Sequence, residues 1–139
     1  MKMFEYAKLF IGTIYKFGGD NPMSGFDCSG LVCEVLRAFG ILSFNERLNA
    51  QQLWNRFHNS NQAVVTRYAD IQADDLIFFG QEGAVVHVAM ATNNVNQMIE
   101  AGGGNFSTDT LVAATERDAF VRLRPTTMRK DFYKAVRLR

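Results

Sequence analysis

Apolar residues recur at helical spacing through the first part of the chain. Apolar positions three and four residues apart over residues 4–14 predict an amphipathic opening helix. A loop that contains Gly and Pro follows, and Asp27 is placed to cap a second helix that begins at Cys28. An apolar stripe continues to Phe39, and Gly40 is a typical stop signal. The pattern therefore predicts two helices before residue 40.

The pattern then changes from helical to extended spacing. Ser43 and Glu46 are spaced as a capping box, which predicts a third helix after Ser43. Short runs rich in β-branched and aromatic residues predict strands at residues 76–79, 85–91, 97–101, 120–123 and 135–138. Helices followed by strands indicate an α+β domain, in which N-terminal helices pack on a C-terminal antiparallel β-sheet.

Composition narrows the class of protein. The chain has 139 residues, 47% hydrophobic and 21% charged, which predicts one globular domain over residues 1–139. A net charge of +1 gives no reason to expect a nucleic-acid partner, and no apolar run approaches the roughly 20 residues of a membrane helix. Two cysteines do not make a disulfide framework. Glu5 and Lys8 stand where a signal peptide would be apolar, so we expect synthesis in the cytoplasm without one.

Basic residues are concentrated at the C-terminal end. From Arg117 onward the chain has eight basic and two acidic residues, whereas the preceding part is net acidic. Such a segment is either a solvated face of surface strands or a patch that contacts anions.

Cys28 is the first candidate for chemistry. It lies in the first turn of the second predicted helix, where unpaired N–H groups and the helix dipole favour a thiolate and can later hold an oxyanion. A buried, inert cysteine at the top of the apolar stripe fits the same position. Cys33 is five residues further along the helix, beyond disulfide reach of Cys28, and neither has the spacing of a zinc site.

His87 interrupts an apolar strand, where a buried imidazole needs a hydrogen-bond partner. If Asn93 and Asn94 form a two-residue turn, Glu100 lies directly opposite His87, with Cβ atoms about 5 Å apart. The carboxylate would fix the tautomer of the imidazole, and the second ring nitrogen would be free to face a thiol. The alternatives are a hydrogen-bonded core histidine and a surface glutamate.

Several segments resemble the motifs of the NlpC-type cell-wall peptidases, which are compact papain-like cysteine peptidases. The block Phe-Asp-Cys-Ser-Gly-Leu around Cys28, with a distal histidine, is the most specific of them. The similarity covers nearly the whole chain from Phe4 onward. Its segments are residues 15–19, 25–32, 75–79, 86–89 and 98–101.

The resemblance implies roles for particular residues. Cys28 matches the nucleophile and His87 the base. Glu100 stands where the family most often has a histidine and sometimes Asn or Gln, and an anionic partner can still orient an imidazole. The positions that match residues lining the substrate groove are Tyr15, Asp27 and Ser29, with packing as the alternative role for Tyr15 and helix capping for Asp27.

The resemblance also implies an activity. It indicates a cysteine endopeptidase or amidase that hydrolyses amide bonds in peptidoglycan stem peptides by acyl transfer, without a metal or an organic cofactor. A transpeptidase, deamidase or acyltransferase on the same scaffold is an alternative. A non-catalytic phage-tail or wall-binding module of the same fold is another.

The chain further resembles variants encoded in phages and prophages, which implies an endolysin-like role. A wall enzyme without a signal peptide reaches its substrate after lysis, by injection or with a carrier. We therefore expect a phage-tail, holin or secretion-system partner, and contact between the basic C-terminal segment and anionic wall polymers.

Overall fold

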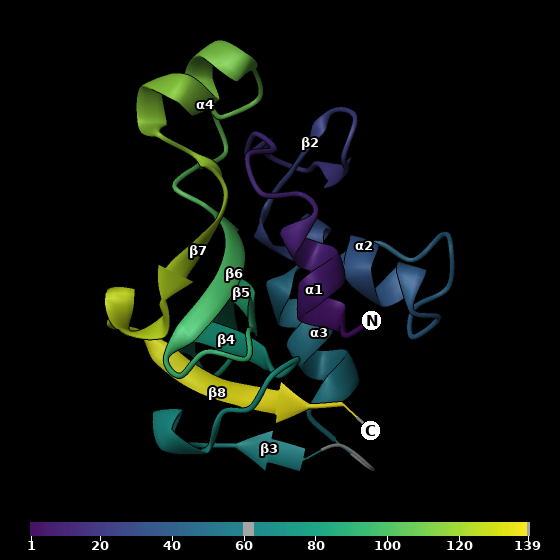
Figure 1. Ribbon diagram of the computed structural model, residues 1–139, viewed down its shortest axis with the longest axis vertical. Helices are drawn as coiled ribbons and strands as arrows, with labels where there is room; N and C mark the ends of the chain where they lie inside the picture. Colours follow the sequence, from purple (N-terminus) through teal and green to yellow (C-terminus); the bar gives the residue numbers. More distant parts are fainter. Residues whose placement is uncertain (60–62, 139) are drawn as a thin grey trace.

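The computed structural model describes residues 1–59 and 63–138 and is built around one large antiparallel sheet (Figure 1). Its strand order is β3-β8-β4-β5-β6-β7, and every neighbouring pair is antiparallel. The strands are β3 (Ala63–Val65), β4 (Leu76–Gln81), β5 (Ala84–Ala91), β6 (Gln97–Gly102), β7 (Phe120–Pro125) and β8 (Phe132–Arg137). A separate small sheet pairs β1 (Asp20–Asn21) with β2 (Gly25–Phe26).

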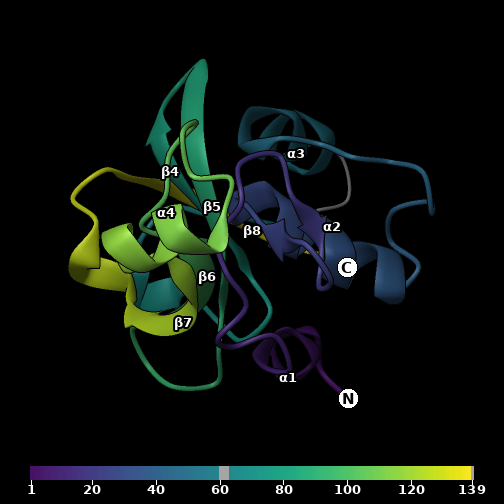
Figure 2. The same cartoon turned by 90° about the horizontal axis from the view of Figure 1, so that it is seen from above.

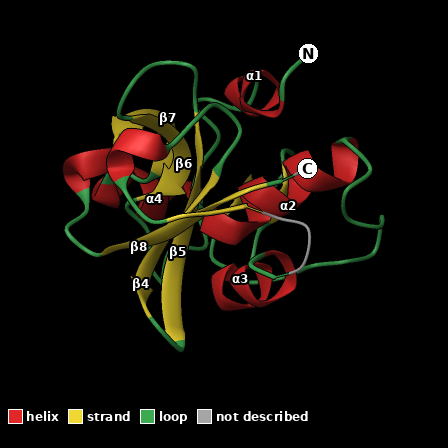
Figure 3. Ribbon diagram, turned by 90° about the horizontal axis from the view of Figure 1, so that it is seen from below, coloured by secondary structure: helices red, strands yellow, loops and turns green. Residues whose placement is uncertain are grey.

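The helices that precede the sheet in the chain gather on one side of it (Figures 2 and 3). They are α1 (Met3–Lys8), α2 (Cys28–Ala38) and α3 (Ala50–Phe57). The fourth helix, α4 (Leu111–Arg117), connects β6 to β7 at the far end of these strands (Figure 1). The arrangement confirms the predicted α+β class. Within the described ranges, no helix combines the length and apolarity that crossing a bilayer requires.

β4 runs through the middle of the core. Leu76 and Phe78 belong to the apolar cluster beneath the helices, while Ile77 and Phe79 belong to a smaller cluster on the opposite face. All four side chains are fully buried. Alternate residues of a strand face opposite sides, so a continuous apolar run is what a strand covered on both faces requires.

The predicted limits of α2 are confirmed. Asp27 has extended backbone angles and its side chain accepts a hydrogen bond from the N–H of Gly30, as an N-cap does. At the other end Gly40 adopts a left-handed φ of 75°, and the N–H of Ile41 donates to the carbonyl of Leu36. Local signals at both ends therefore determine where this helix lies in the chain.

The predicted opening helix is too long. α1 ends at Lys8, and a series of turns follows in which Gly12 has a φ of 95°. Ile14 forms an isolated bridge with Phe120 instead of continuing the helical stripe. The apolar residues of this segment matched helical spacing because Ile14 also packs against the core, but it does so from an extended backbone.

The predicted start of the third helix is wrong. The Ser43 N–H does donate to the Glu46 side chain (2.8 Å), but this bond closes a turn. α3 begins at Ala50, where Asn49 and Gln52 form the capping box. The same local motif therefore occurs twice, and only the second is followed by a helix. The short elements β1, β2, β3 and α4 were not predicted, and β8 begins earlier than expected.

The C-terminal basic segment is in part neutralised by ion pairs. Four of its arginines lie within 4 Å of a carboxylate: Arg122 with Asp118, Arg124 with Glu100, Arg129 with Asp131 and Arg137 with Asp75. The last residue of the segment, Arg139, lies outside the described residues. Contact of this segment with anionic wall polymers stays a prediction.

Asp75 is the one fully buried carboxylate among these ion pairs. Arg137 donates to it through Nε (2.9 Å) and Nη2 (2.8 Å), and the N–H of Gln72 donates to the same carboxylate (2.8 Å). Such a bidentate pair ties β8 to the start of β4.

We expect Arg137→Ala to lower the free energy of unfolding by about 2 kcal/mol, because it leaves the buried Asp75 charge without its partner. Thermal unfolding followed by circular dichroism measures the change. Arg67→Ala is the matched control, since Arg67 pairs with Asp70 on the exposed surface and its loss should leave the midpoint nearly unchanged. Equal midpoints for the two variants would contradict the structural role of Arg137.

Candidate active site

A network centred on Asp27 holds Cys28 at the start of α2. Asp27 Oδ1 accepts hydrogen bonds from the N–H of Gly30 (2.7 Å) and from Nη2 of Arg47 (2.7 Å). Asp27 Oδ2 accepts from the N–H of Gly18 (3.0 Å), which ties the preceding loop to the helix. The half-buried Cys28 side chain thus stands at a helix end whose first N–H groups have no intrahelical acceptor.

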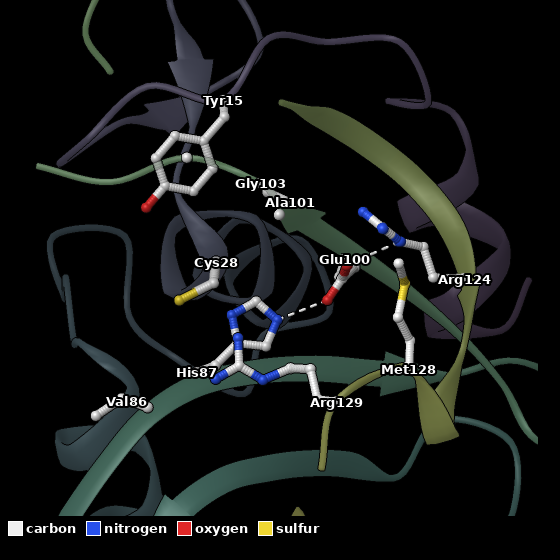
Figure 4. A pocket seen from close by; sticks show the side chains of 12 residues that line it. Tyr15, Cys28, Val86, His87, Glu100, Ala101, Gly103, Arg124, Met128 and Arg129 are labelled. Carbon is white, nitrogen blue, oxygen red and sulfur yellow. Dashed lines mark hydrogen bonds and ion pairs between the residues drawn. The ribbon is translucent and has the colours of Figure 1, made fainter. Parts of the chain in front are cut away.

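His87 and Glu100 form a buried hydrogen bond between β5 and β6. His87 Nε2 lies 2.6 Å from Glu100 Oε1, and the residues are only 6% and 5% exposed. The second ring nitrogen, Nδ1, lies on the side of the ring that faces Cys28 (Figure 4). The thiol, the imidazole and the carboxylate therefore lie in a row in space, although they come from three different elements.

The loop between β5 and β6 is longer than the predicted turn at Asn93 and Asn94. The N–H of Thr92 donates to the carbonyl of Gln97 (3.1 Å), so residues 93–96 form the loop. The Thr92 hydroxyl accepts from the N–H of Asn94 (3.2 Å) and donates to the Gln97 side chain (2.8 Å). The two-residue turn is therefore wrong, because side-chain hydrogen bonds close a wider loop.

The longer loop displaces the register without changing the face. Met90 pairs with Ile99, and extending this register along both strands brings Gly102, not Glu100, level with His87. A displacement of two residues keeps Glu100 on the same face, because side chains alternate with a period of two. Glu100 reaches His87 along the diagonal, which a long side chain can do.

Glu100 is enclosed on its other sides. A Cβ atom at Gly102 would lie 2.6 Å from Glu100 Oε2, so the carboxylate occupies the space that a side chain there would need. Nε of Arg124, on the neighbouring strand β7, lies 3.8 Å from the same oxygen. The carboxylate thus has an imidazole on one side and a guanidinium on the other.

The charges of this pair reinforce one another. Burial alone would lower the pKa of His87, but contact with Cys28 and the hydrogen bond to Glu100 raise it to about 9. Burial would raise the pKa of Glu100, yet the bond to His87 and the charges of nearby arginines hold it below the usual value of 4.5. At neutral pH the pair is therefore an imidazolium and a carboxylate.

A cavity of about 300 Å³ opens beside Cys28 and His87 (Figure 4). Tyr15 and Glu100 line it as well. The Tyr15 ring packs against Gly104, where any side chain would collide with it. Burial raises the pKa of Tyr15, so its hydroxyl stays protonated and can donate a hydrogen bond.

Asp27 and Ser29 line a second hollow, which meets the first at Tyr15 and Cys28. Ser29 Oγ donates to Asp27 Oδ1 (3.2 Å) and accepts from Nη1 of Arg47 (3.0 Å). The polar atoms of both side chains thus hold the start of α2. Their contact with substrate stays a prediction.

The sequence reasoning missed the arginines of the site. Arg47 binds Asp27, and Arg124 and Arg129 line the cavity. The predicted strand ends at residue 123, so no signal in the sequence placed Arg124 at the site. The proximity of Arg124 to Glu100 depends on the pairing of β6 with β7, in which Arg124 lies opposite Met98.

The site has the groups that acyl transfer needs. In residues 1–59 and 63–138, no three side chains of His, Cys, Asp or Glu are grouped as metal ligands. A thiol beside an imidazole, with a carboxylate that orients the ring, is the arrangement used for nucleophilic attack on a carbonyl.

Comparison with known proteins identifies the family. The model of the NlpC/P60 family matches residues 12–124. The chain belongs to the NlpC/P60 family. This confirms the resemblance found in the sequence. The crystal structure of the NlpC/p60 domain of the peptidoglycan hydrolase SagA superimposes with a TM-score of 0.70 and 25% identity, covering 98% of this chain and 96% of that one.

Two relatives of known activity are also similar to part of this chain. The bifunctional muramidase/DL-endopeptidase CwlT of Bacillus subtilis is 36% identical over 91 residues, 63% of this chain and 25% of that protein. The gamma-DL-glutamyl hydrolase of Bacillus subtilis is 34% identical over 105 residues, 73% of this chain and 21% of that protein. The chain thus spans between 21% and 30% of the length of the curated relatives it matches.

We expect Glu100→Gln to lower the pKa of His87 from about 9, because the amide removes the negative charge that stabilises the imidazolium. NMR titration of the imidazole proton measures the shift, with His58 as an internal reference. A pKa raised in the folded state means that protonated His87 contributes to the free energy of unfolding. This contribution is fully present below the usual pKa of 6.5 and is lost as the pH rises through about 9. The variant should lose less stability over this range, and an unchanged titration would exclude Glu100 as the partner.

Iodoacetamide near pH 7 should alkylate Cys28 much faster than Cys33. Cys28 is half-buried beside an imidazolium, whereas Cys33 is fully buried and burial raises the pKa of its thiol. Mass spectrometry of peptides from the labelled protein gives both rates. Equally slow labelling would favour the non-catalytic module.

Proposed function

We propose that this chain is a cysteine endopeptidase that hydrolyses amide bonds in peptidoglycan stem peptides. The observation that carries the proposal is the buried His87–Glu100 pair beside Cys28, at the wall of one cavity. The relatives support the substrate class, because one is named a DL-endopeptidase and another a murein DD-endopeptidase.

In this proposal Cys28 is the nucleophile and His87 its base. The imidazole of His87, whose pKa is raised to about 9, takes the proton of the Cys28 thiol, so that the sulfur attacks as a thiolate. Glu100 accepts from Nε2, which turns Nδ1 toward the sulfur. Glu100 thus orients the base and stabilises its charge.

The reaction then proceeds by acyl transfer. The thiolate attacks the amide carbon, a C–S bond forms, and N–H groups at the start of α2 hold the resulting oxyanion. The C–N bond breaks, and the amine leaves with the proton from Nδ1 of His87. The neutral imidazole next takes a proton from water, the water oxygen attacks the thioester, and the acid and the Cys28 thiolate are released.

Water is the favoured acceptor of the acyl group. Transfer to an amine instead would make the same site a transpeptidase. We favour hydrolysis because Cys28 is half-exposed and the relatives are named hydrolases and endopeptidases. Action at the cell wall as a phage endolysin, after lysis, injection or carrier delivery, stays a prediction from the sequence.

Wild-type protein should solubilise peptidoglycan and release new amino groups, and Cys28→Ala should reduce this release by at least about a thousandfold because no nucleophile remains. Turbidity and amino-group assays on purified peptidoglycan measure it. Cys33→Ala is the matched control, since Cys33 lies away from the cavity in the core. Equal release by Cys28→Ala and wild type would falsify the proposed mechanism.

A further inference from the structure

One end of the catalytic cavity is cationic. Arg124 of β7 and Arg129, which follows the 3₁₀ turn Thr126–Met128, both line it together with His87. Among the described residues that line the cavity, Glu100 is the one carboxylate. His87 pairs with Glu100 and Arg129 pairs with Asp131, so among the described residues Arg124 is the cation of this wall without a hydrogen-bonded carboxylate.

The guanidinium of Arg124 has donors to spare. Its recorded interaction within the described residues is the ion pair of Nε with Glu100 Oε2, at 3.8 Å. This distance is too long for a hydrogen bond. The side chain is 19% exposed, and its guanidinium lies beside Glu100 on the side of Ala101 and Gly103 (Figure 4). Because Arg124 lines the cavity and its guanidinium has no hydrogen bond to the described residues, its N–H groups are available to a ligand there.

Arg129 is held rigidly beside it. Nε and Nη2 bind the two oxygens of Asp131 at 3.0 and 2.9 Å, and the guanidinium lies over the ring of Phe79. These contacts leave Nη1 for a ligand. Asp131 offsets its charge, so Arg129 contributes a fixed N–H donor to the same end of the cavity.

A run of glycines lines the cavity near these arginines. Gly102, Gly103 and Gly104 line the cavity in succession. Glu100 occupies the place of a side chain at Gly102, and Tyr15 the place of one at Gly104. The glycine segment itself therefore adds no side chain to the cavity, and the side chains that a ligand meets along it are those of Glu100 and Tyr15.

We propose that Arg124, with Arg129 beside it, binds a free carboxylate of the peptide whose amide bond is cleaved. This inference rests on the proposed function and adds the substrate feature that the cavity selects. A guanidinium holds a carboxylate through two parallel N–H···O bonds, which fixes orientation as well as position. A stem peptide with a free carboxylate near the scissile bond is then bound in one orientation, with its amide carbon at Cys28.

The test measures binding without turnover. Synthetic stem peptides are titrated by calorimetry into the Cys28→Ala protein in three forms: unmodified, amidated at the C-terminus only, and amidated at the side-chain carboxylate only. We expect one amidated form to bind at least about tenfold more weakly than the unmodified peptide, as loss of a charge-assisted bond predicts. The form that loses affinity identifies which carboxylate is bound.

Adding Arg124→Gln to the same protein should bring the affinity ratio of free to amidated peptide close to one. Arg124→Lys keeps the charge but loses the paired donors, so it should retain only part of the preference. Arg67→Gln is the charge-matched control on the exposed surface and should keep the full ratio. The ratio is the readout because Arg124 also faces Glu100, so its loss can change the turnover of all peptides alike.

The outcomes separate this inference from the proposed function. Equal affinity for all three peptides, or an undiminished ratio in Arg124→Gln, would overturn carboxylate recognition even if wild-type protein cleaves the peptides. A clear preference that depends on Arg124, without cleavage by wild type, would overturn the peptidase and leave the carboxylate site established.

Discussion

The charge of Glu100 is the constraint on which the site depends. A carboxylate that is only 5% exposed has lost most of its hydration, and it stays ionised only if other groups compensate the charge. His87 does so through a hydrogen bond of 2.6 Å and Arg124 through a cation at 3.8 Å. The contact with Cys28 and the ionised Glu100 together raise the pKa of His87. A Cβ atom at position 102 would lie 2.6 Å from Glu100 Oε2, so glycine there leaves the carboxylate its space.

The side chains of the candidate site come from two layers that fold for different reasons. Cys28 belongs to a helix that Asp27 caps, and Arg47 holds that cap from a distant loop. His87 belongs to a strand buried between apolar neighbours. The apolar cluster between the helices and the sheet brings the two layers together, so the same packing that stabilises the domain sets the position of sulfur relative to imidazole.

Glu100 also connects the catalytic chemistry to the substrate side of the cavity. The resemblance leads one to expect a neutral or cationic side chain at this position, which needs no cation nearby. A carboxylate does, and Arg124 and Arg129 lie where they lower its pKa. The same arginines face the cavity. The positive charges that help to keep Glu100 ionised are therefore also charges that a peptide in the cavity would meet.

The sequence by itself determined the order of the main helices and strands and the cap at Asp27, because each has a local signal, and its resemblance to a known family marked Cys28 and His87 as candidates for the reacting residues. The capping box at Ser43 led to a wrong helix start, since a cap does not show whether a helix follows it, and α3 begins after the box at Asn49. Only the tertiary structure decided the register of β5 with β6 and the approach of Arg124 to Glu100. Strand pairing joins residues far apart in the chain, and a loop closed by side-chain hydrogen bonds has no periodic pattern that reveals its length.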